Sequence, residues 1–188
     1  MTYVSPTKYL NPNLDFKRSG IIFYFMKSDT LFFLMGIDST HYELTDFGGT
    51  VENEDFLNAA IREASEESMG LFNINRNALI EQSIAVYNDK SIIMFQPIMV
   101  DNVEGLISQY YNLYIDGLSH HLDQKYLENV SIISISESNL WLVLNDLNPS
   151  ISQSNVSFMS IYPKIYSKIK EILLPLYSRL ISFIKSRI

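Results

Sequence analysis

The sequence predicts a single domain of mixed α and β structure, an α/β (α+β) fold, over residues 1–188. Three observations support this class. A chain of 188 residues is long enough to bury one good hydrophobic core. Short apolar runs, rich in aromatic and β-branched residues, are interspersed with segments of helical periodicity. Hydrophobic residues make up 47% of the chain and charged residues 19%, which excludes long disorder.

At least five strands are expected. The runs cover residues 20–27, 30–37, 82–87, 90–100 and 130–135. The first two are joined by the polar pair Ser28-Asp29 and the next two by Asn88-Asp89, which is typical of β-hairpins. Residues 41–47 are also strand-like and end at the double glycine Gly48-Gly49. Glycine there permits a positive φ or a close backbone approach.

The clearest helix of the first half covers residues 56–69, because its apolar residues recur at i, i+3, i+4 and i+7. These are Leu57, Ala60, Ile61 and Ala64. Residues 103–126 and 139–147 have weaker helical patterns. Residues 162–187 are predicted to form an amphipathic helix with a kink near Pro175. Its apolar face is expected to cover the sheet; docking on an anionic membrane or a partner is the alternative.

Charge and composition exclude several classes of function. Residues 158–188 carry a net charge of +5, which leaves −12 on residues 1–157 of a chain whose total is −7. Such an acidic body disfavours a long nucleic-acid partner, because phosphate backbones are bound by many Lys and Arg side chains. Without cysteine, the chain has no disulfide, thiolate metal site or thiol nucleophile. Neither a signal peptide nor a transmembrane segment is expected, which suggests a soluble, cytoplasmic protein.

Chemistry is concentrated in residues 46–71, which read DFGGTVENEDFLNAAIREASEESMGL. On a helix, Glu63, Glu66 and Glu67 span about 100° of arc beside the apolar stripe. Like charges at these spacings repel, and Arg62 alone cannot neutralise three acids. A hard divalent cation could, because Mg²⁺ and Mn²⁺ prefer oxygen ligands and bind substrate phosphates. The pattern therefore indicates metal-assisted phosphoryl chemistry.

The joint pattern is more specific than the helix alone. Gly48, Glu54, Arg62, Glu63, Glu66 and Glu67 stand at the offsets G-x5-E-x7-R-E-x-x-E-E. Chance produces such a match on the order of once in 10⁵ sequences. This segment resembles the box of the Nudix hydrolase family from Gly48 to Leu71, with one residue, Met69, inserted before Gly70. The resemblance implies an α/β/α sandwich with a mixed β-sheet between helices.

The same resemblance implies roles for individual residues. Glu63, Glu66 and Glu67 would bind Mg²⁺ or Mn²⁺, helped by the carbonyl group of Gly48. Arg62 would hold one of these glutamates, and Glu54 would brace the loop against the helix. The general base is left open among Glu66, Glu67 and two acids outside the box. These are Glu128 and Glu104, which are also the weak candidates for substrate binding.

The implied reaction is hydrolysis of a diphosphate linkage in a nucleoside diphosphate joined to some group X. The low density of Lys and Arg in residues 1–157 favours a small nucleotide as substrate. It disfavours mRNA caps on long RNA and diphosphoinositol polyphosphates, which stay as alternatives. A nucleotide-sensing module without catalysis is a further alternative, although it would not need three crowded acids. Whether the chain forms a homodimer is left open.

Overall fold

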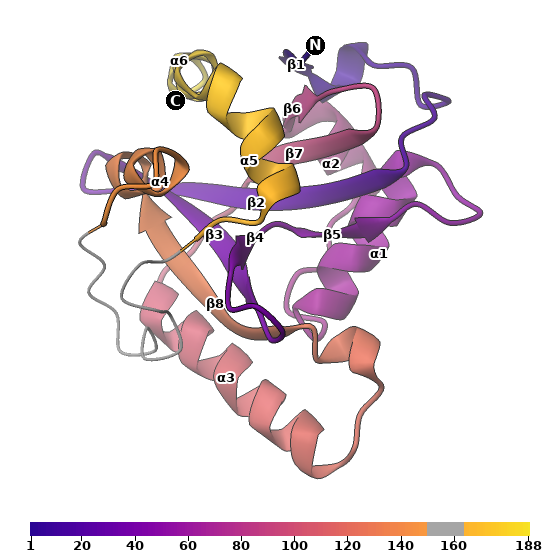
Figure 1. Cartoon of the computed structure of the whole chain (residues 1–188), viewed down its shortest axis with the longest axis vertical. Helices are drawn as coiled ribbons and strands as arrows, with labels where there is room; N and C mark the ends of the chain where they lie inside the picture. The colour runs from indigo at the N-terminus through magenta and orange to yellow at the C-terminus, as the bar shows by residue number, and fades with distance from the viewer. Residues whose placement is uncertain (150–163) are drawn as a thin grey trace.

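A computed structural model describes residues 1–149 and 164–188. Its strands are β1 (Tyr3–Pro6), β2 (Arg18–Lys27), β3 (Thr30–Asp38), β4 (Leu44–Thr45), β5 (Phe47–Thr50), β6 (Ile84–Tyr87), β7 (Ser91–Pro97) and β8 (Asn129–Ser136). Its α-helices are α1 (Phe56–Glu67), α2 (Arg76–Gln82), α3 (Val103–Ser119), α4 (Glu137–Leu144), α5 (Ser167–Leu173) and α6 (Tyr177–Ser186). Short 3-10 helices are η1 (Thr7–Tyr9), η2 (Gln124–Tyr126) and η4 (Leu174–Leu176). Figure 1 shows their arrangement.

The described strands form one mixed sheet in the order β1-β6-β7-β2-β3-β4, with β5 also paired to β2 and β8 to β3. Strands β2 and β7 run parallel, and the other pairs are antiparallel. The β2–β3 hairpin turns at Ser28 and Asp29, whose φ angles of 50° and 63° suit the tight turn that joins twisted strands. The hairpin predicted from the polar pair is therefore confirmed.

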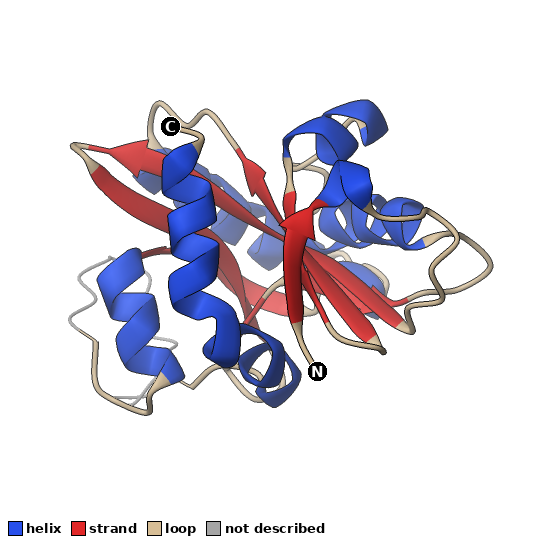
Figure 2. Cartoon of the chain, turned by 90° about the horizontal axis from the view of Figure 1, so that it is seen from above, coloured by secondary structure: helices blue, strands red, loops and turns tan. Residues whose placement is uncertain are grey.

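Alternation along the central strands divides the core into two layers. On β2, Ile22 and Tyr24 face one side, whereas Ile21 and Phe23 face the other. The first side packs against α4, α5 and α6, and the second packs against α1, α2 and α3. Seen from above, helices lie on both sides of the strands (Figure 2). The fold is thus an α/β/α sandwich around a mixed sheet, as the sequence predicts.

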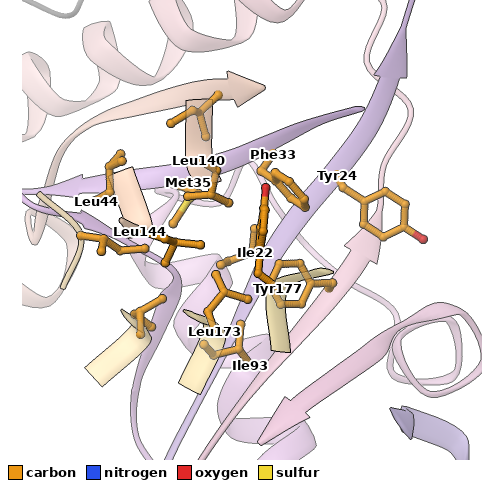
Figure 3. Packing of buried hydrophobic residues seen from close by; sticks show 14 of the residues in the cluster. Ile22, Tyr24, Phe33, Met35, Leu44, Ile93, Leu140, Leu144, Leu173 and Tyr177 are labelled. Carbon is orange, nitrogen blue, oxygen red and sulfur yellow. The ribbon is translucent and has the colours of Figure 1, made fainter. Parts of the chain in front are cut away.

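The C-terminal helices cover the first of these faces. Figure 3 shows Leu173 and Tyr177 packed with Ile22 of β2 and Ile93 of β7. The backbone of Leu44 in β4 bonds both the carbonyl of Lys164, at 2.7 Å, and the amide of Tyr166, at 2.8 Å, which fixes the segment that leads into α5. The expectation that this amphipathic helix covers the sheet is confirmed for residues 167–186. Residues 164–166 are not helical, and residues 162–163 lie outside the described residues.

The kink at Pro175 is also present, because η4 separates α5 from α6 at this proline. Proline lacks the N–H that would continue the helical ladder. None of the helices in the two described stretches combines the length and the apolar character that crossing a membrane requires.

Several boundaries predicted from the sequence are wrong, two of them by more than a few residues. Residues 41–47 do not form one strand, because the side chain of Asp38 accepts the amides of His41 and Glu43 and closes a turn there. Strand β5 instead contains both Gly48 and Gly49. The helix predicted over 103–126 ends at Ser119, where the amide of Leu122 bonds back to the carbonyl of Gly117 at 2.9 Å and closes the helix end. Elements β1 and α2 have no counterpart in the sequence prediction.

Candidate active site

The double glycine allows β5 to lie close to both β2 and α1. A Cβ atom at Gly48 would lie 2.7 Å from the Cα of Gly20 on the paired strand. A Cβ atom at Gly49 would lie 2.5 Å from Oε1 of Glu63. Among the described glycines only Gly70 has a positive φ. Of the two roles that the sequence allows for the pair, close approach is therefore the one observed.

Helix α1 is fixed at both ends. Asp55 caps its N-terminus by accepting the amide of Asn58 at 2.8 Å, and Arg76 binds the same carboxylate at 2.7 Å and 3.0 Å. At the C-terminus Met69 and Gly70 have φ angles of 52° and 80°, and their amides bond back to the carbonyls of Glu66 and Ser65. The inserted residue Met69 therefore lies in the turn that ends the helix, beyond the glutamates.

Glu67 is the deepest of the box glutamates, with 5% of its surface exposed. Its Oε2 accepts the backbone amide of Gly48 at 2.9 Å, which orients the carboxylate toward β5. Burial, followed by a hydrogen bond to Glu128 and the charges of Asp46 and Glu63, raises the pKa of Glu67 well above its usual value.

Three carboxylates converge at this point. Oxygen atoms of Glu63, Glu67 and Glu128 all lie within 4.8 Å of one another. Burial raises the pKa of Glu63 to about 7, and the neighbouring charges of Glu66 and Glu128 act in the same direction, against Arg62. The group contains only oxygen donors and would carry three negative charges when ionised, so its chemistry suits a hard divalent cation.

Arg62 holds the outer side of this group. Its guanidinium donates to Glu54 at 2.6 Å, to Glu63 at 3.1 Å and to Glu66 at 3.4 Å. It also donates to the carbonyl of Thr50 at 3.2 Å, which ties the loop after β5 to α1. Arg62 and Glu54 therefore connect the loop, the helix and one carboxylate of the group.

The remaining predicted site residues lie apart from the three converging carboxylates. Glu66 directs its carboxylate to Arg62, and among the described residues it does not belong to the close group. Glu104 is exposed in the first turn of α3 and is not in the group either. Of the two acids outside the box, the structure thus brings Glu128 to the box and leaves Glu104 at the surface.

A buried ion pair beside the box is absent from the sequence prediction. Arg18 at the start of β2 donates to both carboxylate oxygens of Asp46, at 2.6 Å and 2.8 Å, and Asp46 is fully buried. The ring of Tyr166 lies 5.4 Å from this guanidinium. The pair depends on β2 and β5 lying together, and the contact with Tyr166 depends on the return of the C-terminal segment, so no local motif predicts either.

Glu67, Glu128, Arg18 and Tyr166 border a cavity of about 1070 Å³. Its walls come from the ends of β2, β5 and β8, the C-terminus of α1 and the segment that begins α5. Among the residues that line it are Arg18, Gly48, Gly49, Glu67, Glu128, Asn129 and Tyr166. The volume is large enough for a small nucleotide.

Comparisons with known proteins add one structural likeness. No protein-family model and no curated protein matches the sequence. Among solved structures, the chain is similar to an Ap4A hydrolase of C. elegans in a binary complex, with 16% identity over 89% of this chain and 99% of that chain and a TM-score of 0.49. A second structure of C. elegans Ap4A hydrolase is 14% identical over 88% and 98%, with a TM-score of 0.47. Values this low assign neither an activity nor a site residue.

Fold and site together define an α/β/α domain in which one sheet edge, one helix and one loop hold a carboxylate group over a cavity.

Proposed function

We propose that the chain is a Mg²⁺- or Mn²⁺-dependent hydrolase of a diphosphate linkage in nucleoside diphosphate-X substrates. The observation that carries this proposal is the convergence of Glu63, Glu67 and Glu128 within 4.8 Å, two of which, Glu67 and Glu128, line the cavity. Glu63 and Glu67 belong to the segment that resembles the Nudix box, and Glu128 is one of two acids proposed from outside it.

The three clustered carboxylates are better explained by a divalent cation site than by a solvated surface without an ion. Buried acids with raised pKa values are unfavourable when ionised together, and a cation held among them removes the repulsion. When bound, such a cation neutralises phosphate charge and lowers the pKa of the attacking water. The family resemblance also implies Glu66 as a ligand, so its substitution belongs in the test.

The chain's own residues divide the work in this proposal. The amide of Gly48 orients Glu67, and Arg62 holds Glu63 in place. Glu128 is the exposed member of the group and is tied to it by its hydrogen bond to Glu67. An exposed carboxylate beside the cavity can accept the proton of an attacking water and release it to solvent. We therefore assign the general base to Glu128 rather than to Glu104.

A small nucleotide is the favoured substrate. The net charge of −12 on residues 1–157 opposes long RNA, and the cavity accommodates one nucleotide unit with its phosphates. A non-catalytic nucleotide sensor is the main alternative. It would retain binding but would not require three acids crowded against one another.

The direct test is hydrolysis of a panel of nucleoside triphosphates, dinucleotides and nucleotide sugars, with Mg²⁺ or with EDTA, read by mass spectrometry. Glu67→Gln should lower turnover about 10- to 100-fold, because it removes a charged carboxylate but keeps an oxygen that can accept the amide of Gly48. Glu66→Gln and Glu128→Gln should also lower it. The matched control, Glu104→Gln, should keep wild-type turnover; equal rates for all four variants and wild type would reject the proposal.

A further inference from the structure

Asn129, the first residue of β8, is a buried amide at the carboxylate cavity. Only 1% of its surface is exposed. The side chain lies flat over Gly36 of β3, where a Cβ atom would be 2.5 Å from Nδ2 and 2.8 Å from Oδ1. Only glycine at this position leaves room for the amide. The arrangement of the two strands therefore makes a specific place for Asn129.

The backbone around Asn129 is fixed from two sides. The hydroxyl of Tyr110 donates to the carbonyl of Asn129 at 2.6 Å. The amide of Ser39 donates to the carbonyl of Glu128 at 2.7 Å, and its hydroxyl donates to the carbonyl of Leu127 at 3.0 Å. These bonds hold Asn129 and Glu128 as one rigid unit at the cavity.

The Nδ2 of Asn129 finds no hydrogen-bond acceptor in the described parts of the chain. Buried donors are almost always paired, because an unpaired one loses its bonds to water without replacement. Asn129 lines the same cavity as Glu67 and Glu128. Less than 1 Å² of this Nδ2 is accessible, so the amide must turn about its terminal bond to offer Nδ2 to a ligand in the cavity, and a phosphate oxygen is the strongest acceptor that the proposed substrate carries.

We propose that Asn129 is a substrate-binding residue whose Nδ2 donates a hydrogen bond to a non-bridging oxygen of the substrate's diphosphate. The proposal rests on the proposed function for the identity of the ligand. Asn129 would add a neutral donor on the β8 side of the cavity, where ligand phosphates otherwise meet the carboxylate of Glu128.

Gln96 on β7 provides an internal control. It is also a buried amide with one unpaired atom, Oε1, and its Nε2 already donates to Gln82 at 2.8 Å. Gln96 is not among the residues that line the carboxylate cavity. A ligand in that cavity should therefore affect Asn129 and leave Gln96 unchanged.

The test uses imidodiphosphate, a non-hydrolysable analogue of pyrophosphate, with Mg²⁺ and the full chain labelled with ¹⁵N. The side-chain amide signals of Asn129 are assigned by their loss from the spectrum of Asn129→Asp, and those of Gln96 by their loss from Gln96→Glu. On titration the amide protons of Asn129 should move downfield, whereas those of Gln96 should stay in place. This readout uses the wild-type chain and does not depend on the stability of a variant.

Calorimetry provides the second readout. Asn129→Ala should weaken imidodiphosphate binding about 10- to 100-fold, as expected for the loss of a hydrogen bond to a charged group, and should leave Mn²⁺ affinity within about twofold. Unmoved Asn129 signals at saturation, or equal analogue affinity in Asn129→Ala, would overturn the inference. A chain that binds the analogue through Asn129 but hydrolyses no substrate would retain the inference and lose the proposed function. A chain that does not bind the analogue would overturn the inference directly.

Discussion

Glu63 and Glu67 are buried and repel each other when both are ionised. Their protonation is therefore coupled to the free energy of unfolding. Burial raises the pKa of Glu63 to about 7 and raises that of Glu67 as well. Without a cation, folding therefore favours protonated forms of these side chains. Under the proposed function, a bound cation would replace those protons and reverse the preference.

This coupling predicts how stability changes with pH. The folded chain keeps a proton on Glu63 that the unfolded chain loses above a pKa of about 4.5. The free energy of unfolding in EDTA should therefore fall as pH rises from 5 to 8, by on the order of 2 kcal/mol. Urea unfolding at several pH values measures this slope. Glu63→Gln should reduce this slope and leave the share of Glu67, and Mg²⁺ should reduce it too; a wild-type stability that rises with pH in EDTA would contradict this account.

At the scale of single residues, the sequence predicted those site residues that share one helix. Glu63, Glu66 and Glu67 share one helix, so their spacing alone places them near one another. Glu128 could be named only as one of two acids, because it reaches the box through the pairing of β3 with β8. Asn129 could not be predicted as a site residue, because its role is inferred from an unpaired Nδ2 that only the folded structure shows.

At the scale of elements, the contact between β2 and β5 sets the position of the whole box. Gly20 and Gly48 are paired across these strands, and β5 leads through a loop tied by Arg62 into α1. A side chain at Gly48 would push backbone against backbone, whereas one at Gly49 would meet only the flexible end of Glu63. The two neighbouring glycines therefore have separable roles.

Alanine at each glycine should separate stability from metal binding. Gly48→Ala should lower the free energy of unfolding by about 2–3 kcal/mol, because two strands must move apart. Gly49→Ala should change stability less but should weaken Mn²⁺ binding, because the displaced side chain is that of Glu63. Urea unfolding and Mn²⁺ titration by electron paramagnetic resonance measure the two effects. The reverse order of destabilisation would show that the contact between β2 and β5 does not govern this region.

Helices and strands were predicted correctly where the segment has its own apolar periodicity. They were missed where pairing with another strand determines the structure. Strands β2, β3, β6, β7 and β8 and helices α1 and α4 follow their apolar patterns. Strand β1 forms because Tyr3–Pro6 pairs with β6, although the run is only four residues long and ends in a proline. The pairing partner overrides local propensity there.

At the scale of the whole molecule, the C-terminal helices are part of the core that supports the cavity. Ile169, Ile172 and Leu180 are buried against the sheet face opposite α1. The basic residues of this segment remain mostly in solvent, and Lys170 and Lys185 pair with Asp146 and Glu137 near α4. An apolar face that is already buried is unavailable to a membrane unless the helices detach.

Neighbouring leucines at the end of α5 test this role. Leu173 is fully buried, whereas Leu174 is 38% exposed. Leu173→Ala should lower the free energy of unfolding by about 2–5 kcal/mol because it leaves a cavity in the core. Leu174→Ala should change it by less than about 1 kcal/mol. Chemical denaturation of both variants measures these free energies. Equal small effects would mean that the helix does not pack on the sheet as described.

Anomalous scattering from crystals grown at neutral pH with Mn²⁺ and imidodiphosphate tests the carboxylate group itself. We expect a manganese peak with oxygen atoms of Glu63 and Glu67 at about 2 Å, next to the carboxylate of Glu128. Crystals that contain the analogue but show no manganese among these three carboxylates would contradict the proposed hydrolase.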